Sequence, residues 1–484
     1  MAAAPGFWFY DYETFGTRPT RDRVAQFAAL RTDPSLTPIG EPEILYCAPT
    51  PDFLPDPQAC LITGITPQAA RRNGVCEWEF AAQVHHRLSR PQSCIAGYNN
   101  FRFDDEFTRY LFYRNALDPY AHEFRNGNSR FDLIDVLRLA FALRPDGIVW
   151  PAHDNGKPSF RLEDLAAANG IEHGRAHDAA TDVANTAALA RLLQRAQPKL
   201  WDWALRLRLK TKVESLLTTE PILLHVSARY PAERGCLAPV AVLGRHPLIN
   251  NQYLVYDLGE DPQPFLELPA NDLEDLLYTP AADLPDGRQR LPVKTVRINR
   301  VPMIAPVNAA HGADLGRIGL DLDQARRHAE LLATASDFAG RVQTLFSRAR
   351  FAADGDVEAA LYDGFISDAD RALLNRLRAA PPGDWNTLLA ASRDPRIPEL
   401  MFRVRARHFP ETLDAAEQRR WRRQRRRRLY DPDWATITVD DYRATLAAWR
   451  AAGTAPPVLI DELESWLAEL DLDELEGDGN DENE

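Results

Sequence analysis

Apolar residues come in short runs in the first hundred positions of the chain and then at helical spacing. The short runs are rich in aromatic and β-branched residues, which is typical of buried strands. The longer stretches repeat their apolar positions every three to four residues, which favours helices. The pattern predicts a mixed sheet with helices on its faces, with strands near 6–13, 23–32, 43–48 and 93–100 and helices over 77–89, 104–114, 131–142, 161–169 and 178–196.

The pattern changes after residue 198. A basic stretch, "KLWDWALRLRLKTKVESLL", predicts one helix over 198–217. Runs such as "PILLHVS", "NQYLVYDLG" and "PVKTVRINRVPMIAP" then predict strands separated by Gly, Pro and Asn turns. From residue 354 the pattern is helical again. We therefore expect a β-rich domain over 198–351, a helical domain over 354–471 and an acidic, disordered tail over 472–484.

Length and cysteine content limit the classes of protein to consider. A chain of 484 residues is too long for one core, so two or three domains are expected. We find no apolar stretch of membrane-spanning length, and the N-terminus lacks the basic region of a signal peptide. The five cysteines are odd in number and have no paired spacing, which indicates reduced thiols and a cytoplasmic location.

The net charge of −13 does not describe the body of the chain. Residues 461–484 hold 12 acidic residues and no Lys or Arg. Without that segment the chain has 58 acidic residues against 57 basic ones, and is nearly neutral. The acidic balance is therefore no argument against nucleic acid, because what matters is where the basic residues lie.

The first strand contains two acids inside an aromatic run, "FWFYDYETFG". Residues i and i+2 of a strand point to the same face, so Asp11 and Glu13 converge. Asp-x-Glu pairs are common, and most of them are solvated surface pairs. Here the flanking aromatics place the pair inside, where two like charges need a cation. Oxygen ligands favour Mg²⁺, with Mn²⁺ as the alternative.

Two later segments carry residues that complete such a site. Asp104 follows a predicted strand and begins a helix, and taken alone it is as well explained as a helix-start acid. His177 and Asp182 lie in "GRAHDAATDV", before and within a predicted helix. Alone, the histidine would be read as a capping or surface residue and the aspartate as an exposed acid. The order of the four acids and the histidine favours a shared site.

This order resembles the DEDD superfamily of 3′→5′ exonucleases, in its histidine-bearing branch. The resemblance extends over nearly the whole chain apart from the acidic tail, and is specific to the bacterial exonuclease I family. It is carried by "DYETFGT", "RDRVAQFAALRTD", "LITGITPQ", "GYNNFRFDDE", "FYRN", "DPYA", "SFRLEDLAAANGIEH", "AHDAATDV" and "LYDGFISDADR".

The resemblance implies a fold and a chemistry. The implied domains are an RNase H-like exonuclease domain over 9–188, an SH3-like β-barrel over 198–351 and a C-terminal helical domain over 354–471. Asp11, Glu13, Asp104 and Asp182 would hold two Mg²⁺ ions, and His177 would act as general base. The implied activity is single-strand-specific 3′→5′ exodeoxyribonuclease, releasing 5′-mononucleotides in DNA repair and recombination.

The resemblance also implies contacts with the DNA strand. The stretch 101–125 interleaves aromatic and basic residues, as single-strand binding requires, although about two thirds of its aromatics should be core. An arginine at a helix start, as at Arg161, conflicts with the helix dipole, which favours a functional role. The substrate-binding candidates are Glu13, Thr14, Phe15, Arg109, Tyr120, Phe124, Arg138 and Arg161.

The C-terminal region carries a run of eight arginines, "RRWRRQRRRR", at 419–428. A solvated helix face or a general nucleic-acid patch explains it best. The resemblance implies a further partner, the acidic C-terminal tail of single-stranded DNA-binding protein, for which the run could form part of a dock. The chain's own acidic tail could fold back onto a basic surface, or could simply aid solubility.

Two other functions remain open from the sequence. One is a 3′→5′ exoribonuclease of the same branch, which the length disfavours because such chains have a single domain. The other is a catalytically silent single-stranded DNA-binding scaffold, which the four acids and His177 disfavour. We expect a monomer.

Overall fold

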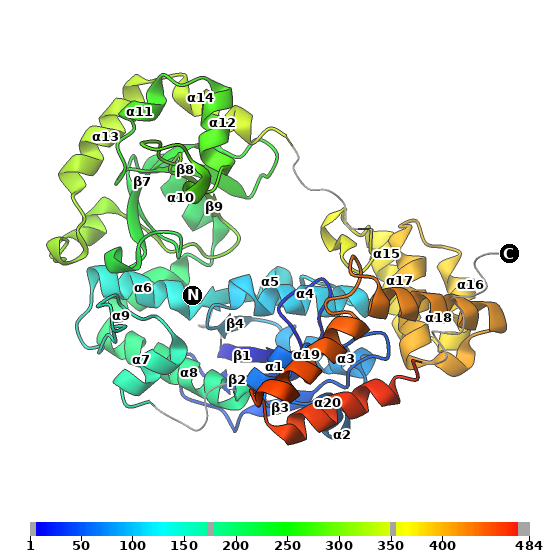
Figure 1. Ribbon diagram of the computed structural model, residues 1–484. Coiled ribbons are helices and arrows are strands. Elements are labelled where there is room, and N and C mark those ends of the chain that lie inside the picture. The colour runs from blue at the N-terminus through cyan, green and yellow to red at the C-terminus, as the bar shows by residue number, and fades with distance from the viewer. Residues whose placement is uncertain (1–5, 172–177, 349–354, 473–484) are drawn as a thin grey trace. The chain divides into compact units, whose positions relative to one another are not determined.

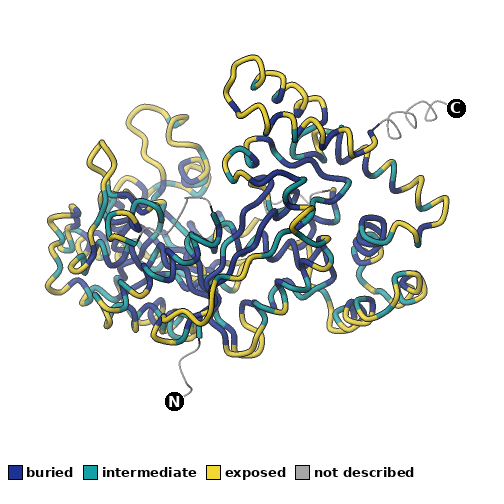
Figure 2. The backbone as a smooth tube through the Cα atoms, turned by 90° about the horizontal axis from the view of Figure 1, so that it is seen from below, coloured by how far each residue is buried: buried dark blue, intermediate teal, exposed yellow. Residues whose placement is uncertain are grey.

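The computed structural model describes residues 6–171, 178–348 and 355–472. The chain forms two compact units (Figure 1). The first unit comprises Met1–Ser129, His173–Ala187 and Ala352–Glu484, and the second comprises Arg130–Glu172 and Ala188–Phe351. Each unit contains one five-stranded sheet. Figure 2 shows helices with a buried side and an exposed side, as expected for amphipathic helices that cover a core.

The sheet of the first unit has the order β3-β2-β1-β4-β5. Its central strand β1 (Gly6–Thr14) pairs antiparallel with β2 (Val24–Thr32) and parallel with β4 (Ser93–Gly97). The outer strands are β3 (Glu43–Tyr46) and β5 (Ser129–Asp132), where the chain passes to the second unit. The mixed sheet expected from the sequence is confirmed.

One face of this sheet is covered by α3 (Glu77–Leu88) and α4 (Asp104–Arg114). Trp8, Tyr10 and Tyr12 pack there against Phe80 and Phe107. Because side chains alternate along a strand, the odd-numbered residues of β1 point to the opposite face. Asp11 and Glu13 therefore lie on the face away from this aromatic core.

The remaining helices of the first unit come from both ends of the chain. Figure 1 shows α19 and α20 close to α1 and α2, and residues of these helices share one apolar cluster with Phe15. The helices are α1 (Pro57–Thr63), α2 (Pro67–Asn73), α5 (Ala121–Phe124), α15 (Asp368–Ala379), α16 (Trp385–Leu389), α17 (Arg396–His408), α18 (Ala415–Tyr430), α19 (Val439–Ala452) and α20 (Pro457–Glu469). The helix α8 (Ala179–Ala196) begins in the first unit and ends in the second.

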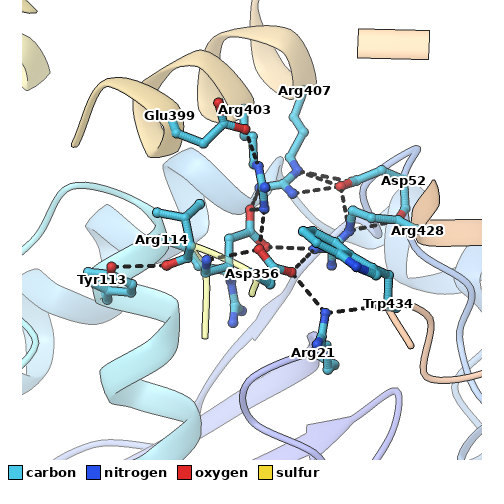
Figure 3. Close-up of polar contacts among 12 residues, drawn as sticks. Arg21, Asp52, Tyr113, Arg114, Asp356, Glu399, Arg403, Arg407, Arg428 and Trp434 are labelled. Atoms are coloured by element: carbon cyan, nitrogen blue, oxygen red, sulfur yellow. Dashed lines mark hydrogen bonds and ion pairs between the residues drawn. The ribbon is translucent and has the colours of Figure 1, made fainter. Parts of the chain in front are cut away.

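A buried cluster of charges joins α17 and α18 to residues of the first 114 positions within this unit. The carboxylate oxygens of Asp356 form ion pairs with guanidinium nitrogens of Arg21 at 3.0 Å, Arg403 at 2.5 Å and Arg428 at 3.0 Å (Figure 3). Asp52 binds Arg407 at 2.6 Å and Arg428 at 3.0 Å. The other members are Arg23, Glu77, Arg114 and Glu358. Four acids thus form ion pairs with six arginines away from water, where buried charges need partners.

The second unit carries an antiparallel sheet in the order β10-β6-β7-β8-β9. The single helix expected over 198–217 is wrong, because α9 (Pro198–Arg206) ends and α10 (Lys210–Thr219) begins within it. The strands are β6 (Leu223–Val226), β7 (Leu237–Arg245), β8 (Gln252–Asp257), β9 (Val293–Arg297) and β10 (Ile304–Pro306). The helices are α6 (Leu133–Leu143), α7 (Leu162–Ala168), α11 (Gln263–Leu266), α12 (Ala270–Tyr278), α13 (Leu322–Thr334) and α14 (Phe338–Leu345).

The chemistry of the cysteines and the lengths of the helices agree with the sequence. All five cysteines are free thiols, as expected, and only Cys76 is exposed. Among the described residues, no helix is long and apolar enough to cross a membrane.

Candidate active site

The strand β1 places two carboxylates on one face of the sheet. Asp11 pairs with Ala28 and Glu13 with Gln26 of β2, and the register is regular from Phe7 to Glu13. A register shift follows between Glu13 and Thr14. A bulge of this kind bends a strand and re-aims its side chains, and is frequent beside active sites.

The third carboxylate comes from α8. Asp182 lies in the first turn of that helix, where the dipole favours a negative charge. Ligand oxygens of Asp11, Glu13 and Asp182 all lie within 4.8 Å of one another. The fold thus brings together two acids from the first strand and one from a helix more than 160 positions later.

Burial and mutual repulsion disfavour the charged forms of these acids. Burial, then Asp182, raises the pKa of Asp11 to about 8. Burial, then Asp11 and Asp182, raises the pKa of Glu13 to about 9. Asp178 adds a smaller repulsion at Glu13. Three clustered carboxyls that resist ionisation need either protons or a cation to compensate them.

Asp104 lies beside this group, at the start of α4. It is buried, and its Oδ1 accepts a hydrogen bond from the backbone N–H of Tyr12 at 3.1 Å. Burial, followed by repulsion from Asp11, raises its pKa well above the usual value. Asp104 therefore shares the electrostatic environment of the three acids, although its oxygens lie outside the 4.8 Å group.

The neighbouring Asp105 has a different partner. Its Oδ1 accepts a hydrogen bond of 2.6 Å from the hydroxyl of Tyr10, on the aromatic face of β1. Both acids of the pair thus fix the start of α4 to β1, with Asp104 toward the acid cluster and Asp105 toward the core.

The donor set fits a hard divalent cation. All three clustered ligands are carboxylates, and Mg²⁺ and Mn²⁺ prefer oxygen ligands. A bound cation would also compensate the repulsion that raises the pKa values of Asp11 and Glu13. The site therefore suits metal-assisted phosphoryl transfer, which requires positive charge near the attacking and leaving oxygens.

The candidate base, His177, lies outside the described residues. Its neighbour Asp178 is described, and its carboxylate accepts hydrogen bonds from the N–H of Ala180 and the hydroxyl of Thr181. The sequence analysis did not single out Asp178, which repels Glu13 and belongs to the electrostatic environment of the site.

The end of β1 is tightly packed. The hydroxyl of Thr14 donates to the carbonyl of Gly16 at 2.6 Å. The ring of Phe15 is fully buried and packs against Phe53, so this side chain is not available for stacking on a base. The backbone of Phe15 is also engaged, with Arg23 and Asp56.

The basic and aromatic candidates around α4 and α5 differ in how exposed their side chains are. Arg109 is buried, with its guanidinium on Glu123 at 2.6 Å and Glu106 at 2.8 Å. It also lies under the ring of Tyr120. Tyr120 stacks on Phe124, which is 59% exposed. The aromatic pair is therefore the accessible part of this set, and Arg109 supports it from below.

Two aromatic residues outside the expected set lie beside Tyr120 and Phe124. A cavity of about 350 Å³ in the first unit is lined by Tyr120, Phe124, Tyr362 and Phe365, among others. Tyr362 is 54% exposed and Phe365 is 96% exposed. Both come from "LYDGFISDADR", a stretch noted only for its resemblance, so spacing within 101–125 could not have revealed them.

Two candidates belong to the second unit. Arg138 is mostly buried on α6, where it pairs with Asp135 at 2.6 Å. Arg161 occupies the N-cap position of α7, is exposed and pairs with Glu163. The expected conflict between this arginine and the helix dipole is therefore present.

Comparison with known proteins shows similarity along nearly the whole chain. Three family models match: "Exonuclease" at residues 8–190, "Exonuclease I SH3-like domain" at 208–348 and "Exonuclease I C-terminal domain" at 355–470. The exodeoxyribonuclease I of Escherichia coli (strain K12) is 46% identical over 438 residues, which cover 90% of this chain and 92% of that protein.

Two solved structures are similarly close. An exonuclease I from Methylocaldum szegediense has a TM-score of 0.91 at 46% identity, covering 96% of this chain and 99% of that one. The zinc-bound form of an E. coli exonuclease I–single-stranded DNA complex has a TM-score of 0.90 at 43% identity, again covering 96% and 99%.

Proposed function

The chain belongs to the exodeoxyribonuclease I family, and on that premise we propose that it removes nucleotides from the 3′ end of single-stranded DNA. The observation that carries the proposal is the group formed by Asp11, Glu13 and Asp182 in the segment that matches an exonuclease. The chain is a metal-dependent hydrolase, and its proposed role is in DNA repair and recombination.

The proposed metal is Mg²⁺, with two ions per site and Mn²⁺ as a substitute. Asp11, Glu13, Asp104 and Asp182 would hold them. When bound, Mg²⁺ supplies the positive charge that phosphoryl transfer needs at the attacking and leaving oxygens. The three clustered carboxylates support this assignment, as does the raised pKa of Asp104 beside them.

His177 is the proposed general base. His177 precedes Asp182 by five positions in the sequence, and the ordinary pKa of a histidine, near neutrality, suits proton removal from water. The water attacks the terminal phosphodiester, and the 3′-oxygen of the penultimate nucleotide leaves. The product is a 5′-mononucleotide.

The DNA strand is proposed to reach the cavity formed by Tyr120, Phe124, Tyr362 and Phe365. Exposed rings offer faces on which bases of any sequence can stack, and this is how proteins hold single strands. Glu13, Thr14 and Phe15 at the end of β1 remain proposed contacts of the 3′ terminus. Arg109, Arg138 and Arg161 remain proposed contacts of the strand.

The proposed protein partner is single-stranded DNA-binding protein, through its acidic C-terminal tail. The second unit has a mostly apolar cavity of about 500 Å³ lined by Leu139, Leu143 and Trp203. Arg144 and Lys199 also line it, so the cavity combines apolar walls with positive charge. An acidic peptide that ends in apolar residues matches both features. We expect Trp203→Ala and Arg144→Ala to weaken binding of such a peptide.

The protein is proposed to act as a monomer in the cytoplasm. The clustered acids all come from one chain, and the free thiols fit a reducing compartment.

One assay separates this function from its alternatives. The substrates are a labelled single-stranded DNA, its duplex and the RNA of the same sequence, each with Mg²⁺ or EDTA. We expect mononucleotide release from single-stranded DNA with Mg²⁺ alone. Preference for RNA would indicate an exoribonuclease, and DNA binding without release would indicate a silent scaffold.

A further inference from the structure

The arginine-rich helix α18 has one face that the fold does not use. Arg425 and Arg428 are buried, and Arg428 belongs to the charge cluster around Asp356. Arg420 pairs with Glu399, and Arg427 lies over the ring of Trp434 at 3.6 Å. Several arginines of this run are therefore structural, and only part of the run forms the solvated helix face expected from the sequence.

Three other arginines of α18 form an exposed stripe, which we call the arginine stripe: Arg419, Arg423 and Arg426. They follow one another at spacings of four and three residues, so they share one side of the helix. None of them makes an ion pair with any residue in the part of the chain that the structure describes. Like charges at this spacing destabilise a helix unless an anion compensates them.

The last described residues pack against α18. Leu470 and Leu472, which follow α20, are buried in the apolar cluster that includes Leu429 of α18. The guanidinium of Arg425 donates a hydrogen bond of 2.5 Å to the carbonyl of Leu470. The last described residue, Leu472, is therefore held beside α18.

The segment that follows Leu472 is opposite in charge to the arginine stripe and long enough to reach it. Residues 473–484, "DELEGDGNDENE", contain seven acids and no Lys or Arg. Twelve extended residues can span up to about 40 Å, and a helix of 16 residues, as α18 is, measures about 24 Å. The segment can thus reach every position of the arginine stripe.

We propose that the acidic segment 473–484 docks on the arginine stripe of α18 and keeps other polyanions off this face. Attachment beside the helix gives the segment an effective concentration on the order of millimolar, which favours it over free acidic ligands of modest affinity. The interaction is electrostatic, so it weakens as salt rises. The proposal does not depend on nuclease activity.

The test uses a fluorescent peptide, DELEGDGNDENE, added to the protein at low ionic strength. Binding is measured by anisotropy to the full chain and to a variant that ends at Leu472, which keeps the buried leucine in place. We expect the shortened protein to bind the peptide at least about tenfold more tightly than the full chain. Equal affinities, or no binding to the shortened protein, would overturn the proposal.

Two further variants locate the site. In the shortened protein, the triple change Arg419→Gln, Arg423→Gln and Arg426→Gln should reduce peptide binding by about tenfold or more. The matched control replaces three exposed arginines elsewhere, Arg31, Arg326 and Arg327, with the same loss of charge. Equal effects of the two sets would reject the arginine stripe as the site.

A full-length variant controls for the effect of truncation itself. In this variant the seven acids of 473–484 are changed to Asn or Gln. This variant should bind the peptide as tightly as the shortened protein does. Binding as weak as that of the native chain would show that tail charge does not occupy the face.

Discussion

Asp11 on β1 and Asp182 on α8 hold carboxylate oxygens within 4.8 Å of each other, together with Glu13. The short distance between these oxygens depends on the fold of the whole exonuclease segment, because its first strand supplies Asp11 and its last helix supplies Asp182. Burial and the charge of Asp182 together raise the pKa of Asp11 to about 8. The acids thus form one electrostatic unit, which governs the predictions for metal and pH.

Removing one acid should abolish turnover while the DNA still binds. Asp182→Asn keeps the size of the side chain but removes a charge that the cation needs. Disturbing even the outer partners of a metal site costs about 10–100-fold in metal affinity or activity, so we expect a loss of more than 10²-fold. Single-turnover kinetics and DNA affinity, measured side by side, check this. Asp272→Asn, at an exposed acid of α12, is the matched control and should leave turnover unchanged.

Magnesium should stabilise the protein more as the pH rises. The pKa values of Asp11 and Glu13, near 8 and 9 in the metal-free fold, exceed those of the unfolded chain near 4. Their protonation therefore favours folding fully below pH 4, and this stabilisation is lost as pH rises through 8 to 9.

Thermal unfolding in EDTA and in Mg²⁺, followed from pH 6 to pH 9, measures the effect. The melting temperature in EDTA should fall over this range, and the gain from Mg²⁺ should grow. In Asp11→Asn the dependence on pH should flatten. A gain from Mg²⁺ that stays constant across the range would contradict the assignment of these acids as metal ligands.

The charge cluster should be the most sensitive structural site of the first unit. Burial alone would raise the pKa of Glu358, but Arg407, Arg428 and other arginines offset it and hold it well below the usual value. Glu358→Gln leaves buried arginines short of a partner and should cost about 3–5 kcal/mol of unfolding free energy. Urea unfolding measures it. Asp323→Asn, which breaks an exposed pair with Arg326, should cost almost nothing.

The same cluster predicts a loss of stability in acid. A carboxyl whose pKa is depressed by folding contributes stability above its unfolded pKa, near 4, and loses it as pH falls through the folded value. Glu358→Gln should therefore show a weaker loss of stability below pH 4 than the native chain does. This window lies below the one set by Asp11 and Glu13, so the two effects can be measured separately.

The aromatic cavity should contribute to the binding of single strands. Removing a ring that stacks on a base costs about 1–3 kcal/mol, so Phe124→Ala and Phe365→Ala should each weaken DNA binding by roughly tenfold or more. Fluorescence anisotropy with a labelled oligothymidine measures it. Val458→Ala removes an exposed apolar side chain of α20 and should leave affinity unchanged. Equal affinities for all variants would place the strand elsewhere.

The sequence predicted the sheet and the convergence of Asp11 and Glu13 from local pattern, whereas the place of Asp182 beside them was expected from the order of the acids and from the resemblance. Alternation along β1 places the two acids on one face, and the helical period places Asp182 in the first turn of α8. Partners across the fold were not predictable in this way. Arg109 was expected to contact the strand, yet it is buried and forms ion pairs with Glu123 and Glu106.

Distance along the chain explains the other differences. Tyr362 and Phe365 reach the cavity of Tyr120 and Phe124 from a segment more than 230 positions away. The sequence of the arginine run does not reveal which arginines are buried, and Arg428 is buried because it forms ion pairs with Asp52 and Asp356 from elsewhere in the fold. The break between α9 and α10 falls within a continuous basic stretch with no Gly or Pro to mark it.

The most direct test of the account follows a 5′-labelled single-stranded oligonucleotide with Mg²⁺, using the native chain and Asp182→Asn. The account predicts a ladder that shortens one nucleotide at a time from the 3′ end, stops on addition of EDTA and is absent in the variant. Internal fragments, shortening that persists in EDTA, or a normal ladder with Asp182→Asn would contradict it.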